Sequence, residues 1–219
     1  MSLLVDVPYS QKDEVKALGA FWNNERKKWY VKNKYDYPKF KKWILNNTDF
    51  ATIICDHIYI VIGKKECFKC HRQTTVIGLG LENYYEISEE AVFENDKTYW
   101  YYYKDIHIAS ELSPLPEKLL THLKNQYNYY KSYSKTLKSE CYANHCEHCN
   151  IIQGNFFLFE EPDSPFSIDS KEAAENLKLI KIPLEFDLIL DWVDVGYGSE
   201  DYLIKQYGKF ENPNMDLSI

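Results

Sequence analysis

The first 48 residues alternate short apolar and polar runs in a pattern that predicts a small module of helices and strands. A strand is expected over residues 3–7, where leucines and valines precede a proline. Ser10 stands at the N-cap position of a helix expected over residues 11–18, with an acid in its first turn. Gly19 follows that helix and suits the left-handed backbone at which many helices end.

A two-stranded hairpin and a second helix complete the predicted module. The hairpin covers residues 21–32 and turns at a polar Asn-Asn-Glu run. Alternation along its second strand directs Trp29 and Val31 to one face and the polar side chains to the other. The second helix is expected over residues 38–45, with its lysines facing outward. The expected core is aromatic and consists of Trp22, Trp29, Phe40 and Trp43.

A second, larger segment follows, in which strands outnumber helices. Leu119, Leu120 and Leu123 recur at helical spacing, which predicts a helix that can extend to Tyr133. A shorter helix is expected over residues 171–177, after a polar cap. Strands are expected over residues 52–62, 74–79, 99–103, 106–108, 155–159, 179–182 and 186–193.

These elements predict an α+β fold with a mostly antiparallel sheet. They divide the chain into a small basic tryptophan-rich module, residues 1–48, and a zinc-binding α+β domain, residues 52–219. The division also separates two regions of different charge. Residues 1–50 hold ten Lys and Arg against six acids, a balance of +4, and the rest of the chain holds 16 against 27, a balance of −11. Two modules with different partners would explain this split.

Composition is that of an ordinary soluble protein. Of the 219 residues, 45% are hydrophobic and 27% are charged. No apolar run approaches the roughly 20 residues of a membrane helix, and the first residues lack the basic and apolar regions of a signal peptide. The expected location is therefore cytoplasmic, and no membrane partner is expected.

Lysines and one tyrosine gather on the predicted outer side of the N-terminal module. Positive side chains along a nucleic-acid backbone, next to an aromatic ring for base stacking, are typical of single-strand binders. Exposed lysines also simply solvate a small domain, and the acidic remainder of the chain would repel DNA unless it faced away. The candidate nucleic-acid residues are Lys28, Tyr30, Lys32, Lys39, Lys41 and Lys42.

The N-terminal segment resembles a short bacterial domain of unknown function that is often attached to plasmid- and phage-type primases, helicases and other DNA-processing proteins. The resemblance covers less than a quarter of the chain. It implies association with nucleic-acid proteins and no particular activity. The motifs that carry it are Val7-Pro8-Tyr9, Lys12-Asp13, Leu18-Gly19-Ala20, and the spacing from Trp22 to Trp29-Tyr30.

Four of the six cysteines form two Cys-x-x-Cys elements. In a reducing compartment such cysteines indicate metal ligands rather than disulfides. Each element directs two sulfurs at one ion, and together they complete a closed tetrahedral site with no position for water or substrate. The sequence predicts one structural Zn²⁺ that clasps the 75 residues between the pairs. Its ligands are Cys67, Cys70, Cys146 and Cys149.

Other interpretations of these cysteines stay open. A redox Cys-x-x-Cys opens a helix within a βαβ unit, a context that neither pair has. An iron–sulfur cluster uses the same ligands, and unliganded thiols are a further alternative. Cys55 is expected to be a small buried hydrophobe. Four neighbours stand near enough in sequence to replace a ligand or to surround the site: His71, Cys141, His145 and His148.

No catalytic constellation is recognised, so we expect a protein that is not an enzyme. Gly78 and Gly80 lack the remaining residues of a phosphate-binding loop, and the serine-hydrolase and zinc-protease motifs are missing. The expected function is that of an accessory or binding module for DNA or RNA; the alternative is a protein–protein interaction component of a bacterial mobile-element or defence system. Four carboxylates are interpreted as ordinary edge-strand or turn charges and not as catalytic groups: Asp56, Asp187, Asp191 and Asp194.

Overall fold

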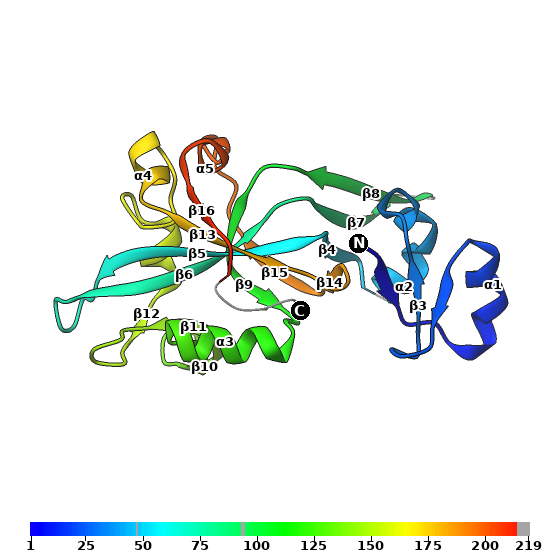
Figure 1. Ribbon diagram of the computed structural model, residues 1–219, viewed down its shortest axis with the longest axis horizontal. Coiled ribbons are helices and arrows are strands. Elements are labelled where there is room, and N and C mark those ends of the chain that lie inside the picture. The colour runs from blue at the N-terminus through cyan, green and yellow to red at the C-terminus, as the bar shows by residue number, and fades with distance from the viewer. Residues whose placement is uncertain (47, 93–94, 214–219) are drawn as a thin grey trace.

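A computed structural model describes residues 1–46, 48–92 and 95–213. The strands of this part of the chain form four sheets, two of three strands, one of six and one of four. Figure 1 shows an elongated molecule with the N-terminal module at one end and a long hairpin reaching toward the other. The strand pairs are antiparallel, apart from a parallel pair near the C-terminal end and one isolated parallel bridge. The predicted α+β fold with mostly antiparallel sheets is confirmed.

The N-terminal module is a three-stranded sheet with short helices. Its strands lie in the order β1-β3-β2, and Gly19 turns with φ +98° after the first α-helix, as predicted. No side chain caps that helix, because a 3₁₀ turn precedes it and Gln11, not Ser10, occupies the N-cap. The elements are β1 (Leu3–Val5), η1 (Tyr9–Gln11), α1 (Lys12–Ala17), β2 (Phe21–Asn23), β3 (Lys28–Val31), η2 (Lys34–Phe40) and α2 (Lys41–Leu45).

The aromatic core of this module is smaller than predicted. Phe40 is fully buried and Trp43 is nearly so, but Trp22 keeps 46% of its exposure. Trp22 lies on β2, an edge strand, where its ring meets Trp29 edge-on at 5.6 Å. An edge position gives a large ring only one neighbour in the sheet.

The module shares one hydrophobic core with the four-stranded sheet beside it. Leu3, Phe40 and Ile44 pack in the same cluster as Ile53 and Tyr85 of that sheet. The division predicted between residues 48 and 52 falls between α2 and β4, and residues on both sides of it pack in one continuous core. The sheet order is β14-β4-β7-β8, from β4 (Phe50–Ile54), β7 (Tyr84–Val92), β8 (Asn95–Tyr103) and β14 (Leu188–Leu190).

The six-stranded sheet forms the centre of the larger segment (Figure 1). Its order is β15-β9-β6-β5-β13-β16, and β5 and β6 form the long hairpin. Gly78 leaves room on β6 for a side chain of the neighbouring strand β9, since a Cβ there would lie 2.5 Å from Ile108. The strands are β5 (His57–Glu66), β6 (Gln73–Leu81), β9 (His107–Ser113), β13 (Lys178–Pro183), β15 (Trp192–Val195) and β16 (Lys209–Glu211).

Two strands predicted as continuous are each divided between sheets. The run over residues 52–62 breaks at Asp56, whose φ of +69° turns the chain from β4 into β5. The run over residues 186–193 breaks at Asp191, between β14 and β15. A left-handed residue cannot continue a strand, which explains the break at Asp56. Each predicted strand becomes a corner between the two sheets.

A smaller three-stranded sheet packs near the tip of the β5–β6 hairpin. The helix that was expected to reach Tyr133 stops at Asn128, which has φ +52°, and a strand begins there. The strand expected over residues 155–159 was also wrong, because the backbone there forms one π-helical turn. The elements are α3 (Glu117–Tyr127), β10 (Tyr129–Ser134), β11 (Ser139–His145), β12 (Ile152–Gln153) and η3 (Phe156–Glu160), followed later by α4 (Lys171–Glu175) and α5 (Tyr202–Tyr207).

None of the helices in the described residues is long and apolar enough to cross a membrane.

Candidate metal centre and nucleic-acid interface

The four predicted cysteine ligands converge on one point. Their sulfurs all lie within 4.8 Å of one another, with Cys67 Sγ 3.7 Å from Cys149 Sγ and Cys70 Sγ 3.7 Å from Cys146 Sγ. Four thiolates at about 2.3 Å from a tetrahedral zinc ion stand about 3.8 Å apart. The sulfur positions therefore fit the group that the spacing predicted, and the donor set, four sulfurs, is one that soft divalent metals prefer.

The two Cys-x-x-Cys turns have the same backbone hydrogen bonds. In the first, Cys67 N–H donates to Arg72 O, and His71 N–H donates to Cys67 O, both at 2.9 Å. In the second, Cys146 N–H donates to Ile151 O, and Asn150 N–H donates to Cys146 O, also at 2.9 Å. The residue after each second cysteine is left-handed, with φ +56° at His71 and +57° at Asn150. Each turn is thus a knuckle that directs two sulfurs to one side.

Backbone amides favour the thiolate form of the first cysteine in each knuckle. Burial raises the pKa of a thiol, but the N–H groups of the turn outweigh burial at Cys67 and lower its pKa to about 6. The pKa of Cys146 is also lowered; burial opposes this change, and the backbone N–H of His148 contributes to it. Because the thiolate is the form that binds a metal, these amides prepare the site for a cation.

A side chain of β11 and a backbone N–H of the second knuckle attach this region to β6. Asn144 is 1% exposed, and its amide forms two bonds with one residue: Ile77 N–H donates to Oδ1 at 2.7 Å, and Nδ2 donates to Ile77 O at 2.9 Å. Glu147 N–H donates to Thr74 Oγ1 at 3.1 Å. The hairpin and the small sheet are therefore held together at the knuckles by direct bonds as well as by the sulfur cluster.

The neighbouring histidines and cysteines stay outside the group of four sulfurs. His145 stacks on Tyr130 at 3.8 Å with its Nε2 beside Ser132 Oγ, and His148 Nε2 lies 2.9 Å from Gln73 O. His71 is exposed, and Cys141 lies on β11 apart from the cluster. Cys55 is fully buried between the N-terminal module and its sheet, as expected of a small hydrophobe.

The carboxylates that the sequence singled out have separate structural contacts. Among the described residues they form no group that could hold a metal ion, because only the four cysteines bring three or more ligand atoms together. Asp194 accepts a hydrogen bond from Ser110 Oγ, and Asp191 is exposed. Asp187, 4% exposed, accepts bonds from Tyr37 Oη at 2.6 Å and from Asp56 N–H at 2.9 Å. Asp187 therefore joins the N-terminal module to the corner between β4 and β5.

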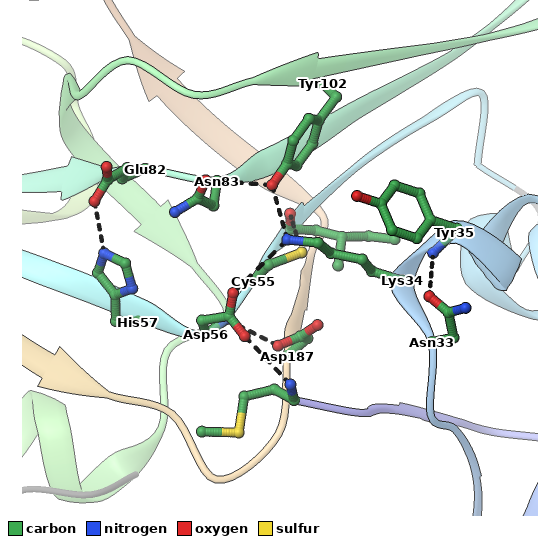
Figure 2. A network of polar contacts seen from close by, with 12 residues as sticks. Asn33, Lys34, Tyr35, Cys55, Asp56, His57, Glu82, Asn83, Tyr102 and Asp187 are labelled. Carbon is green, nitrogen blue, oxygen red and sulfur yellow. Dashed lines mark hydrogen bonds and ion pairs between the residues drawn. The ribbon is translucent and has the colours of Figure 1, made fainter.

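A polar network surrounds this corner (Figure 2). Lys34 donates to Tyr102 Oη at 2.9 Å and lies 3.9 Å from an oxygen of Asp56. On the other side of the corner, His57 Nε2 lies 2.9 Å from Glu82 Oε2. Each charged group in Figure 2 has a partner of opposite charge or a hydrogen bond, so the network acts as an attachment between the sheets and the module.

The candidate basic residues are divided by their partners. Four of the lysines each form an ion pair with a nearby carboxylate. Such exposed pairs contribute at most about 1 kcal/mol each. They can therefore exchange a carboxylate for a phosphate at little cost, but they do not form one continuous patch. The pairs are Lys28 with Asp6 at 2.8 Å, Lys39 with Asp36 at 2.6 Å, Lys41 with Glu89 at 2.9 Å and Lys42 with Glu14 at 2.9 Å.

Tyr30 and Lys32 stand apart from the other candidates, because no carboxylate of the described chain pairs with Lys32. Its ammonium lies 4.2 Å above the ring centre of Phe21, and the ring of Tyr30 lies 5.7 Å from the same ring. Phe21 keeps 47% of its exposure. Leu4 is paired with Tyr30 in the sheet, whereas the alternate residues of β1 and β3 point into the core. The outer face of the β1-β3-β2 sheet thus carries two aromatic rings and a cation.

Phe21 is the residue that the sequence interpretation missed. It stands next to Trp22 in the predicted hairpin, and the sequence assigns a role in the core to Trp22 but none to Phe21. Alternation along the strands could have revealed its position. Trp29 faces inward, and its cross-strand partner Trp22 shares that face. Phe21, the residue before Trp22, must then lie on the outer face.

Comparison with known proteins places the N-terminal module in a described family. Residues 3–44 match a domain of unknown function, DUF5710, which confirms the resemblance found in the sequence. Two DNA primases named TraC, both from Escherichia coli, are 49% and 46% identical to this chain over 39 residues. The matches cover 18% of this chain and only 4% and 3% of the primases. No solved structure matches the chain significantly.

Proposed function

We propose that this chain is a zinc-stabilised accessory module that binds single-stranded nucleic acid through the outer face of its β1-β3-β2 sheet. The zinc part rests on four sulfurs at the spacing that a tetrahedral ion requires. A closed four-sulfur site has a structural role, so we propose a binding function and assign no reaction.

The observation that carries the binding role is the arrangement of Lys32, Phe21 and Tyr30. An exposed ring with an ammonium 4.2 Å above it and a second ring beside it offers a stacking surface and a charge for the adjoining phosphate. Lys28 lies on the same face of β3 and can leave Asp6, which is 74% exposed. The similarity to DNA primase TraC supports a role near DNA, because a 39-residue stretch of that protein is 49% identical to the N-terminal module.

Fluorescence anisotropy with a labelled 12-nucleotide single strand, titrated with the full chain at low and moderate salt, tests the proposal. Stacking of a base on a ring contributes about 1–3 kcal/mol, so Phe21→Ala should weaken binding at least about fivefold. Lys32→Ala should weaken binding and lower the salt slope by about 0.7, the value for one phosphate contact on a single strand.

The matched control lies on the β10–β11 hairpin. Tyr133 keeps 58% of its exposure and Lys135 is exposed, so Tyr133→Ala and Lys135→Ala remove the same chemistry from a different sheet. Binding that is lost equally in both pairs of variants, or unaffected by Phe21→Ala and Lys32→Ala, would exclude the outer face of the module as the binding surface.

One observation favours the alternative of a protein–protein contact. Beside the first knuckle, Phe68 keeps 64% of its exposure and Phe157 keeps 50%, and both line an apolar hollow of about 410 Å³. Large exposed rings beside a rigid turn are typical of protein-binding surfaces. If single strands do not bind, Phe68→Ala in a pull-down from the native host is the first variant to compare with the unmodified chain.

A further inference from the structure

The turn at the tip of the β5–β6 hairpin places an exposed aromatic ring among positive side chains. Phe68 lies within the first knuckle and keeps 64% of its exposure. Lys69 follows it directly, and Lys64 and Arg72 flank the same knuckle along the chain. All three cationic side chains are exposed, and we call them the knuckle cations. The tip therefore combines a ring with three positive charges over residues 64–72.

No carboxylate of the described chain forms an ion pair with a knuckle cation. The other charged groups of the turn have partners: Lys65 Nζ lies 3.4 Å from Glu161 Oε2, and Glu66 Oε1 lies 3.2 Å from His71 Nδ1. Most candidate lysines of the N-terminal module differ in this respect, because each of those has an acid beside it. A phosphate can therefore approach the knuckle cations without first displacing a carboxylate.

The apolar hollow of about 410 Å³ lies beside this ring, and Phe68, Phe157 and Leu158 contribute to its lining. Phe157 keeps 50% of its exposure, so two rings that are both partly open to solvent border the hollow. Nucleobases stack on such rings in any sequence, since every base has a π-face.

The knuckle cations decide which class of ligand fits these rings. The rings alone would also suit an apolar protein surface. Such a surface would cover Lys69 beside Phe68 without offering a counter-charge, and burying an unpaired charge is costly. A single strand meets both requirements, because it supplies bases for the rings and phosphates for the cations.

The knuckle also holds these groups in a fixed arrangement. Backbone hydrogen bonds close the turn around Phe68, one from Cys67 N–H to Arg72 O and one from His71 N–H to Cys67 O. A surface that is ordered before binding loses less conformational entropy when its ligand arrives.

We propose that the tip of the β5–β6 hairpin is a second contact for the single strand that the N-terminal module binds. Bases stack on Phe68 and Phe157, and phosphates lie at the knuckle cations. This inference rests on the proposed function. The module and the hairpin tip lie toward opposite ends of the molecule (Figure 1), and the ten residues of β5 alone span about 30 Å. A strand must therefore be long to reach both contacts.

Fluorescence anisotropy of the full chain with labelled single strands of 12 and 36 nucleotides tests the proposal. Binding at one contact makes the other intramolecular, so the tip adds affinity for the longer strand. Phe68→Ala should weaken binding of the longer strand at least about fivefold, the loss expected for one stacked base. It should change binding of the shorter strand less than about twofold, because the module holds that strand alone. Lys69→Ala should lower the salt slope of the longer strand by about 0.7.

Matched controls remove the same groups elsewhere. Phe156 keeps 54% of its exposure and does not line the hollow, and Lys135 is exposed on the β10–β11 hairpin. Phe156→Ala and Lys135→Ala should leave the binding of both strands unchanged. Four thiolates around Zn²⁺ carry a net negative charge that Lys69 can also balance, so elemental analysis and thermal melts accompany each variant. Phe68→Ala keeps every charge of the knuckle and tests the stacking independently of the metal.

Affinity for the longer strand that Phe68→Ala and Lys69→Ala leave unchanged, or that falls equally in Phe156→Ala and Lys135→Ala, overturns the second contact. Phe21→Ala separates this result from a failure of the proposed function, because it should weaken binding of both strands. If Phe21→Ala affects neither strand while Phe68→Ala weakens the longer one, the tip alone binds and the proposed function fails. Absence of binding by either strand overturns both.

Discussion

Replacing Tyr37 by phenylalanine removes one oxygen atom from the buried contact between the N-terminal module and the rest of the chain. Tyr37 is fully buried, and its hydroxyl donates to Asp187 Oδ2 at 2.6 Å. Burial and the nearby carboxylate raise the pKa of Tyr37, so it is the donor at every pH of interest. The variant keeps the ring and its packing, and it deprives Asp187 of one of two hydrogen bonds.

A hydrogen bond to a charged group contributes about 1.5–3 kcal/mol, and Asp187, at 4% exposure, has little surface on which water could replace it. We therefore expect Tyr37→Phe to lower the free energy of unfolding by that amount. The control is Tyr35→Phe, which removes the same atom from a side chain that is 75% exposed; its effect should stay within about 0.5 kcal/mol.

Urea denaturation at pH 7, followed by tyrosine and tryptophan fluorescence, measures both variants. A shifted midpoint with an unchanged slope means that the contact stabilises the native fold as a whole, whereas a split transition means that the module separates first. If Tyr37→Phe and Tyr35→Phe unfold at the same urea concentration, Asp187 does not join the module to the sheet in the way described.

Three further predictions concern other contacts. Cys67→Ser should lose stoichiometric zinc in elemental analysis and melt earlier, whereas Cys141→Ser should keep the metal, and zinc retained by the first variant would contradict the four-sulfur site. Asn144→Ala should cost about 2–5 kcal/mol, because the N–H and C=O of Ile77 both lose a buried partner; a loss below 1 kcal/mol in urea would show that water replaces the amide. Burial raises the pKa of Glu82, but bonds from neighbouring donors outweigh it and lower the pKa to about 2, so the stability it adds is complete above pH 4.5 and is lost as pH falls toward 2. Glu82→Gln should accordingly be less stable by about 2–3 kcal/mol at pH 7 and equal to the unmodified chain near pH 2, and parallel stability curves would refute this.

The parts of the structure that sequence predicted are those decided by neighbouring residues. A Cys-x-x-Cys turn is formed within six residues, and Gly19 ends its helix through its own backbone freedom. The clustering of two distant pairs followed from chemistry, because four soft ligands in one chain share an ion more readily than they stay apart.

The failures have causes that lie far away in the sequence. Asp56 turns with φ +69° and donates its N–H to Asp187, 131 residues later, and no local pattern in a β-branched run announces such a turn. Trp22 looked like a core residue because it is large and apolar, but burial depends on having a strand on both sides. The exposed ring of Phe21 has a local cause instead, because its face follows from alternation once Trp22 is paired with Trp29.

Because its core continues under α2 and β4, we expect the DUF5710 segment not to fold stably as an isolated domain. Cut out alone, residues 3–44 would expose Leu3, Phe40 and Ile44 to water on the side now covered by Ile53 and Tyr85. We expect a protein that carries this segment to cover the same side chains with an apolar surface, either a neighbouring sheet in the same polypeptide or a surface on another molecule. Grafting experiments should therefore transfer the segment together with this surface.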